Sequence, residues 1–266
     1  RGLGDVYKRQ VFDTPLSEGG IAAIAFGMGL NGLKPVCEIQ FADYIFPAYD
    51  QIVNEIAKLR HRSGGEFWTP VTIRTPAGGG IRGGHHHSQS PESQFTHTPG
   101  LKVVYSSTPY NAKGLLISAI ESEDPVIVFE PKRCYRGPFY GDPHKVPTWS
   151  GHAEAEVPDV HYTVPIGEAR LVTEGNDCTV IAWGTMVHVC EEGIRQSGAS
   201  CDLIDLQSLI PWDREAVVRS VKKTGRCVIV HEAPKTSGYG AEMAASVQER
   251  CFWSLEAPVT RVTGWD

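Results

Sequence analysis

The chain has 266 residues, 41% of them hydrophobic, with 25 Lys and Arg against 31 Asp and Glu, for a formal net charge of −6. This length is roughly twice that of a ~150-residue domain, so we expect two packed cores. No run of like charge forms a basic surface for nucleic acid. No stretch approaches the ~18 apolar residues of a membrane span, and no charged segment leads into an apolar one as in a signal peptide. The composition indicates a soluble protein that binds neither nucleic acid nor membranes.

The seven cysteines are scattered along the chain without a C-x-x-C pair. A disulfide framework or a zinc ribbon needs paired, regularly spaced cysteines. The pattern therefore favours free thiols in a reducing cytosol or matrix.

The first half of the chain alternates between predicted helices and strands. SEGGIAAIAFGMGLNG predicts a helix of small residues that Ser17 caps and an Asn-Gly pair ends. PVCEIQF, residues 35–41, predicts a short buried strand. Residues 47–65 predict an amphipathic helix, because apolar residues recur at helical spacing before a basic, glycine-rich end. Three further apolar runs have strand length, with a helix at 111–122 between the last two: residues 71–76, 101–107 and 125–131.

Regular patterning stops at residues 136–165, which hold prolines and glycines without a period and predict a linker over the surface. Alternation resumes in the second half, with helices predicted at 214–225 and 241–255. Strands are predicted at residues 177–184, 201–207, 226–233 and 259–264. We therefore expect an α/β fold with two parallel-sheet domains.

Glu18 is the first candidate for chemistry, because it lies in the first turn of a helix of otherwise small and apolar residues. One interpretation is a surface carboxylate that favours the positive end of the helix dipole. The other is a carboxylate in apolar surroundings that needs a partner from outside, since a buried unpaired charge costs several kcal/mol.

The segment GGHHHSQSPE supports three interpretations: a zinc site, a solvated polar loop, or a single acid/base histidine. Consecutive extended residues point to alternate sides, so His85 and His87 share a face at most, and no H-x-x-x-H or carboxylate pair completes a metal site. His87 is the best placed, because Ser88, Gln89 and Glu92 follow it and could orient its ring.

The preceding AGGGIRGG matches neither the P-loop nor the dinucleotide fingerprint. We expect a flexible loop near a ligand, with a plain surface turn as the alternative.

From about Val11 to Asp266 the chain resembles the beta chain of branched-chain 2-oxo acid dehydrogenases, the decarboxylating component, of bacterial and hence cytoplasmic type. The resemblance rests on VFDTPLSEGGIAAIAFGMGL, EIQFADYIFPAYDQIVNEIAK, GGHHHSQSPE, FEPKRCYRGPF and KTGRCVIVHEA. IQFADYIFPA favours the branched-chain type over the pyruvate type. Residues 1–10 are expected to be non-native, because RGLGDVYKRQ does not continue naturally into VFDTPLSEGG. By comparison with the family, a first strand and a C-terminal segment are expected to be missing.

The resemblance implies a thiamine diphosphate enzyme with a pyrimidine-binding domain at 11–135, a linker at 136–165 and a transketolase C-terminal-like domain at 166–266. It implies that Glu18 hydrogen-bonds a pyrimidine nitrogen and that Leu16, Gln40 and Tyr44 line the pyrimidine pocket. It also implies that His87 assists acyl transfer to lipoamide on a transacylase core, with His85 and His86 as bystanders.

A missing motif implies a partner. The family holds the diphosphate and magnesium with G-D-G followed by N-N, and this chain has no G-D-G and only isolated asparagines. The resemblance therefore implies that an alpha subunit holds the magnesium and half of the cofactor in an α2β2 heterotetramer, and that the beta chain is active only with it. Some relatives also bind potassium, mainly through carbonyl groups, at positions that align with Val71, Thr72, Ala119, Ser122 and Asp124.

Three alternatives remain at this point. The chain could be a pyruvate- or acetoin-specific beta subunit of the same family. It could be a docking module that has lost activity, or a metal-dependent hydrolase built on the histidines.

Overall fold

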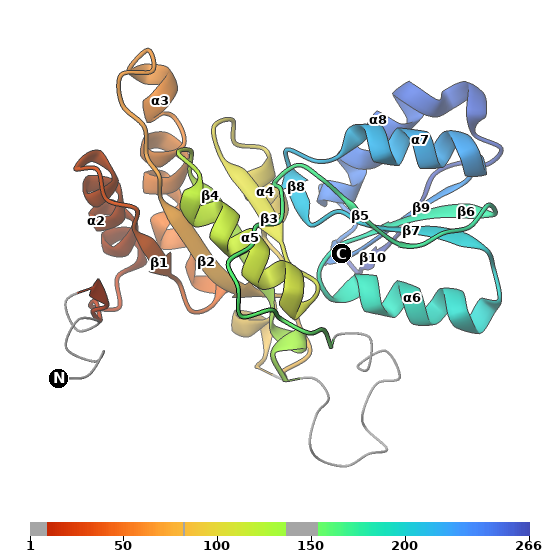
Figure 1. Ribbon diagram of the computed structural model, residues 1–266, viewed down its shortest axis with the longest axis horizontal. Coiled ribbons are helices and arrows are strands. Elements are labelled where there is room, and N and C mark those ends of the chain that lie inside the picture. Colours follow the sequence, from red (N-terminus) through yellow and green to blue (C-terminus); the bar gives the residue numbers. More distant parts are fainter. Residues whose placement is uncertain (1–9, 82, 137–153) are drawn as a thin grey trace.

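The computed structural model describes residues 10–81, 83–136 and 154–266, and it contains two five-stranded sheets that lie side by side (Figure 1). The strand order is β1-β2-β4-β3-β8 in the first sheet and β10-β9-β6-β7-β5 in the second. The predicted α/β architecture with two sheets is therefore confirmed.

Four parallel strands form most of the first sheet: β1 (Val36–Glu38), β2 (Thr72–Ala77), β3 (Lys102–Tyr105) and β4 (Val126–Pro131). Helix α2 (Glu18–Leu30) packs on one face through Ala22 and Ala25, and α5 (Pro109–Glu121) packs on the other through Leu115 and Ala119. Successive strand residues face opposite sides, so both faces of the central strands are covered by apolar side chains.

A strand from the second half of the chain completes this sheet. β8 (Ser208–Ile210) runs antiparallel to β3, with Val103 opposite Ile210. In the second sheet, β5 (Arg170–Thr173) is antiparallel to β7 (Cys201–Asp205). Both sheets are thus mainly parallel, as expected, and each has one antiparallel strand at an edge.

Two predicted elements of the first half differ from the structure. β1 is an edge strand with Val36 and Glu38 exposed, so it is buried on one face only. The predicted helix at 47–65 is split: η2 (Phe46–Ala48) is a 3₁₀ turn, η3 (Gln51–Ile56) is π-helical, and α3 (Leu59–Arg62) is a single α-helical turn. The wider turn, closed by the Ala57 amide on the Ile52 carbonyl at 2.9 Å, places Ile52, Val53 and Ile56 together in the core.

The second sheet has α6 on one face and α7 and α8 on the other (Figure 1). Asp213 caps α7 by accepting the Ala216 amide at 3.0 Å, and Gly225 ends it in the left-handed conformation, as the sequence predicts for a helix at 214–225. The remaining elements of this half are β6 (Cys178–Ala182), β9 (Cys227–Pro234), β10 (Thr260–Gly264), α6 (Thr185–Ser197), α7 (Arg214–Thr224) and α8 (Tyr239–Cys251).

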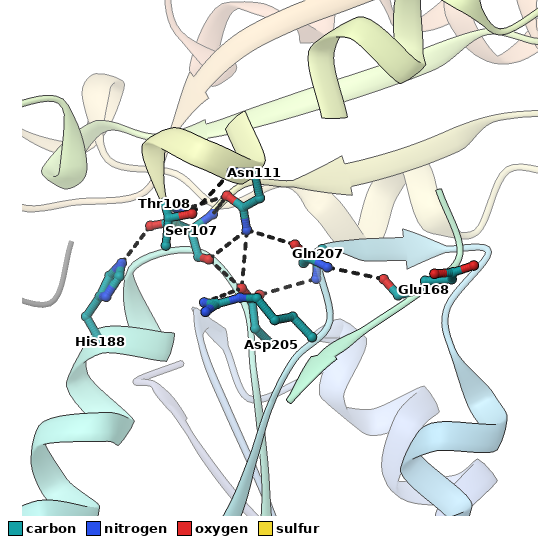
Figure 2. Close-up of polar contacts among 8 residues, drawn as sticks. Ser107, Thr108, Asn111, Glu168, His188, Asp205 and Gln207 are labelled. Atoms are coloured by element: carbon teal, nitrogen blue, oxygen red, sulfur yellow. Dashed lines mark hydrogen bonds and ion pairs between the residues drawn. The ribbon is translucent and has the colours of Figure 1, made fainter. Parts of the chain in front are cut away.

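A buried polar network joins the two halves, as Figure 2 shows. Asn111 of α5 donates to Asp205 at 3.3 Å and to Gln207 at 3.1 Å, and the Ser107 hydroxyl donates to Asp205. His188 Nε2 of α6 lies 2.6 Å from the Ser107 carbonyl oxygen. Buried polar groups give a rigid, specific arrangement when all of them are hydrogen-bonded. Because the partners here come from both halves, the network fixes the position of one half relative to the other.

The described part of the predicted linker, residues 154–165, has no regular structure and runs along α5. Lys113 donates to the Val160 carbonyl at 3.0 Å, and the rings of Tyr110 and Tyr162 stack at 4.6 Å. Residues 137–153 of the linker, and 1–9 of the segment expected to be non-native, lie outside the described residues. No helix in the described part of the chain is both long and apolar enough to cross a membrane.

Candidate active site

The candidate residues gather where the parallel strands of the first sheet end. Residues 40–44 follow β1, residues 78–87 follow β2, and Lys132 follows β4 directly. The carboxyl ends of parallel strands meet at one edge of a sheet, where ligands of α/β proteins bind. Residues 40–44 and His87 therefore follow strands that end at the same edge of the first sheet.

Glu18 begins α2 and is half-buried, and it makes no hydrogen bond or ion pair with another described residue. Ser17 precedes the helix, but its side chain does not cap it. At Gly19 a Cβ would lie 3.1 Å from the Pro47 carbonyl oxygen, so the first turn of α2 lies against η2. The argument from a fully buried charge does not hold, because water reaches the carboxylate. What remains is a carboxylate without a partner among the residues that the structure describes.

The three residues expected to line a pyrimidine pocket with Glu18 are all exposed. Leu16 is 99% exposed and Tyr44 is 36% exposed, and Gln40 also faces solvent. Of these, Tyr44 contacts His87, with ring centroids 5.8 Å apart. The predicted pocket is therefore an open surface in the single chain.

The structure distinguishes His87 from its two neighbours. Its ring packs edge-on against Phe41 at 4.5 Å between centroids, and its Nδ1 is buried without a hydrogen-bond partner among the described residues. His85 and His86 are exposed and lie against each other at 3.8 Å between centroids. This arrangement favours a single functional histidine. Within the described part of the chain, no group of three His, Cys, Asp or Glu side chains could hold a metal ion.

Two of the three residues expected to orient the His87 ring, Ser88 and Glu92, have other side-chain partners. The Ser88 hydroxyl donates to the Gly84 carbonyl at 2.7 Å. Glu92 is buried in α4 (Glu92–Thr96) and accepts from Trp183 Nε1 at 3.2 Å. The aromatic rings of Phe41 and Tyr44, not these polar groups, hold the imidazole.

Neighbouring side chains approach the backbone of the glycine-rich loop closely. Gly78 has φ 81°, and a Cβ there would lie 2.4 Å from Glu232 Oε2. At Gly80, with φ 97°, a Cβ would lie 2.6 Å from Arg133 Cδ, and at Gly83 it would lie 2.6 Å from His87 Cβ. The positive φ of Gly78 and Gly80 favours glycine, and a Cβ at any of the three positions would require a neighbouring side chain to move. The loop follows β2 directly and leads into His87, as expected of a loop near a ligand.

Sequence reasoning missed two charged residues of this region, Asp43 and Lys132. Both side chains are almost fully buried, with exposed fractions of 1% and 2%. Lysine is rarely buried without a partner. The position of Lys132 directly after the apolar run of β4 was the sequence signal that could have identified it.

Buried ionisable groups lie between the two halves, next to the glycine-rich loop. Burial raises the pKa of Glu92 to about 7 and that of Glu232 to about 7. Burial also lowers the pKa of His231 to about 4. A cavity of about 340 Å³ borders Gly79, His231 and Glu232. The contact between the halves therefore contains groups that titrate near neutral pH.

The five residues aligned with a potassium site lie near the start of β2 and the end of α5: Val71, Thr72, Ala119, Ser122 and Asp124. Lys102 Nζ lies 3.0 Å from Ser122 Oγ and 3.2 Å from Asp124 Oδ2. The side chains of Ser122 and Asp124 are thus engaged by an ammonium group, and Thr72 Oγ1 is buried without a hydrogen-bond partner among the described residues. Potassium binding stays a prediction.

Comparisons with known proteins agree with the fold. Residues 2–138 match the family model of the transketolase pyrimidine binding domain, and residues 167–266 match that of the transketolase C-terminal domain. In the solved structure of a split-gene transketolase, an inactive beta4 tetramer, the matched chain has a TM-score of 0.70 at 22% identity. The match covers 98% of this chain and 77% of that one, and it supports the fold alone.

Curated relatives are more similar. The 2-oxoisovalerate dehydrogenase subunit beta of Pseudomonas aeruginosa is 55% identical over 97% of this chain and 74% of its own. The mitochondrial subunit of the same name from Dictyostelium discoideum is 55% identical over 100% of this chain and 69% of its own. The pyruvate dehydrogenase E1 component subunit beta of Acholeplasma laidlawii is 45% identical over 100% of this chain and 78% of its own. The chain therefore belongs to the family of 2-oxo acid dehydrogenase beta subunits.

Proposed function

We propose that this chain is the beta subunit of a branched-chain 2-oxo acid dehydrogenase, which oxidatively decarboxylates branched-chain 2-oxo acids and transfers the acyl group to lipoamide. The main support is its 55% identity, over 97% of the chain, to a 2-oxoisovalerate dehydrogenase subunit beta. The unpartnered carboxylate of Glu18 and the aromatic-packed imidazole of His87 add support from geometry.

The residues present fit half of a thiamine diphosphate site. Glu18 offers a carboxylate without a partner among the described residues, and Leu16, Gln40 and Tyr44 offer exposed side chains. Bound thiamine diphosphate supplies a nucleophilic carbon that makes the loss of carbon dioxide from a 2-oxo acid possible. In this proposal Glu18 holds a proton at a pyrimidine nitrogen, which is general acid/base work for a carboxyl group.

In the second step His87 moves a proton at the imidazole as the acyl group passes to lipoamide on a transacylase core. Phe41 and Tyr44 fix the plane of the ring from two sides. A proton donor or acceptor must lie within hydrogen-bond reach of the reacting atoms, so a fixed ring is a useful property at this position.

The open site is best explained by a partner. Leu16 is 99% exposed next to Glu18, and Ile24 on the same helix is 50% exposed. An alpha subunit that covers this surface would supply the diphosphate and magnesium ligands in an α2β2 heterotetramer. An alpha subunit bound here would also bury these apolar side chains.

Co-expression with an alpha subunit tests the proposal. We expect a complex with the mass of α2β2 that binds thiamine diphosphate and decarboxylates branched-chain 2-oxo acids. Very weak cofactor binding by the beta chain alone is expected, because the diphosphate ligands are on the partner. Tight calorimetric binding to the isolated chain would contradict the divided site.

A pyruvate-specific subunit is the second candidate, because the Acholeplasma laidlawii protein named for pyruvate dehydrogenase is 45% identical over 100% of this chain. Turnover of the assembled complex with pyruvate against branched-chain 2-oxo acids separates the two. A higher kcat/KM for pyruvate would replace the branched-chain assignment.

A further inference from the structure

A buried ion pair lies beneath the segment that carries His87. Lys132 Nζ is 3.8 Å from Asp43 Oδ2, and the two side chains are 2% and 1% exposed. Lys132 begins η5 (Lys132–Arg136) after β4, and Asp43 is in η1 (Ala42–Tyr44) after β1. The pair therefore joins the loops that follow two different strands.

Both members of the pair bind the backbone around His87. Lys132 Nζ donates to the His87 carbonyl oxygen. Asp43 Oδ1 accepts the amides of Ser88 and Gln89, each at 3.3 Å. Three backbone groups in consecutive residues are thus held by two charged side chains.

The pair also contacts the ring that packs on His87. Lys132 Nζ lies 4.7 Å from the centroid of Phe41, whose ring is 4.5 Å from that of His87. A cation over an aromatic face is attracted to it. Phe41 is thereby fixed between the ammonium group and the imidazole.

We propose that Asp43 and Lys132 are positioning residues for His87, which hold its backbone and ring in the orientation needed for acyl transfer to the lipoyl group. The proposal rests on the proposed function of His87. Burying two charges is costly, and a pair in this state is retained only where its geometry and hydrogen bonds compensate. Burial lowers the pKa of Lys132 while Asp43 and Glu232 oppose the change.

The test uses the complex assembled with its alpha subunit and two assays. One measures 2-oxo acid decarboxylation with an artificial electron acceptor, and the other measures lipoamide-dependent turnover. For Lys132→Met we expect lipoamide-dependent turnover to fall roughly 10- to 100-fold, because a shift of ~1 Å at a reacting group has this effect. Decarboxylation and the KM for the 2-oxo acid should change by no more than about 3-fold. Lys132→Arg, which keeps a cationic donor, should recover most of the lost turnover.

Lys223→Met is the matched control, because Lys223 pairs with the buried Asp202 at 2.7 Å in the other half of the chain. It should leave both assays unchanged. Asp43→Asn combined with Lys132→Met removes both charges together, so this variant folds without an unpaired buried charge and gives the same split between the assays. Equal losses in both assays, or no loss in either, would overturn the proposal.

Hydrogen exchange of residues 83–92 gives a readout that does not depend on the reaction. Exchange should be faster in Lys132→Met than in the unsubstituted complex and unchanged in Lys223→Met. Unaltered exchange in Lys132→Met would overturn the positioning role even if the complex is an active dehydrogenase. An unsubstituted complex that decarboxylates no 2-oxo acid would instead refute the proposed function, and faster exchange would still support the contacts of Lys132.

Discussion

Glu18 is a proposed site residue because of its position at the start of α2 and its missing hydrogen-bond partner. The half-buried carboxylate begins α2 and has no partner among the described residues. A surface carboxylate at a helix N-terminus contributes a few tenths of a kcal/mol to stability. If Glu18 is only a surface carboxylate, its removal lowers stability slightly. If it acts on the cofactor, its removal slows catalysis strongly.

Glu18→Gln keeps the size of the side chain but removes its acidic proton. Decarboxylation by the assembled complex should slow by about 10² or more, as is usual for the loss of a general acid/base. Glu242→Gln in the first turn of α8 is the matched control and should have little effect. Near-normal decarboxylation by the Glu18 variant would show that the role is misassigned.

The three histidines provide an internal comparison. His87→Ala should lower lipoamide-dependent turnover by roughly 10² to 10⁴, while decarboxylation with an artificial acceptor falls much less. His85→Ala and His86→Ala should leave both assays within a few-fold of normal, because these side chains are exposed. Similar damage from all three substitutions, with loss of a bound metal, would favour the metal interpretation instead.

The candidate site was only partly predictable from single residues. His87 contacts Tyr44, which the sequence did not predict. The proposed roles of Ser88 and Glu92 in orienting the ring were wrong, because sequence proximity does not fix side-chain direction. Lys132 reaches the His87 carbonyl from another strand. This contact depends on which strands are neighbours in the sheet, and the sequence pattern does not give the strand order.

At the scale of elements, local signals worked where they were complete. The helix at 214–225 has an acidic cap, basic residues in its last turn and a glycine end, and α7 has these bounds within one residue. The segment 47–65 has a helical apolar pattern too, but its π-helical turn depends on core packing that periodicity does not report. β8 was missed because three residues next to a proline carry no strand pattern of their own.

The cap of α7 has a measurable effect on stability. Asp213 accepts the Ala216 amide at 3.0 Å and the Ala169 amide at 3.1 Å, so it also ties the helix to the segment before β5. Asp213→Ala should lower the free energy of unfolding by about 1–2 kcal/mol, as for other N-caps. Denaturant titration measures this loss, and Asp213→Asn, which keeps an acceptor, should lose less. Equal losses in both variants would contradict a capping role.

At the scale of the whole molecule, Glu92 links the two halves through Trp183. Burial raises the pKa of Glu92 from 4.5 to about 7, so the folded state holds this proton more tightly than the unfolded state. Its contribution to stability is complete below about pH 4.5 and is lost as the pH rises through about 7. Ionisation of Glu92 therefore weakens the contact between the halves.

Glu92→Gln keeps the acceptor for Trp183 without the charge. At pH 8 we expect Tm to exceed that of the unsubstituted protein by roughly 2–4 °C, the shift that ~1 kcal/mol produces in a chain of about this size. The difference should shrink toward pH 5. Thermal unfolding at the two pH values tests this, with Glu249→Gln on the surface of α8 as the control. A difference independent of pH would exclude ionisation of Glu92 as its cause.

The pairing of β8 with β3 has a consequence for synthesis on the ribosome. Val103 leaves the ribosome long before its partner Ile210, and at roughly 5–20 residues per second the delay lasts several seconds. During that time β3 has an unpaired edge, which can pair with another chain. Nascent chains that end before Ser208 should therefore be cut by protease within residues 101–107 more readily than chains extended well past Ile210. Equal cleavage of the two lengths would show that the edge is protected in another way while the chain is still being made.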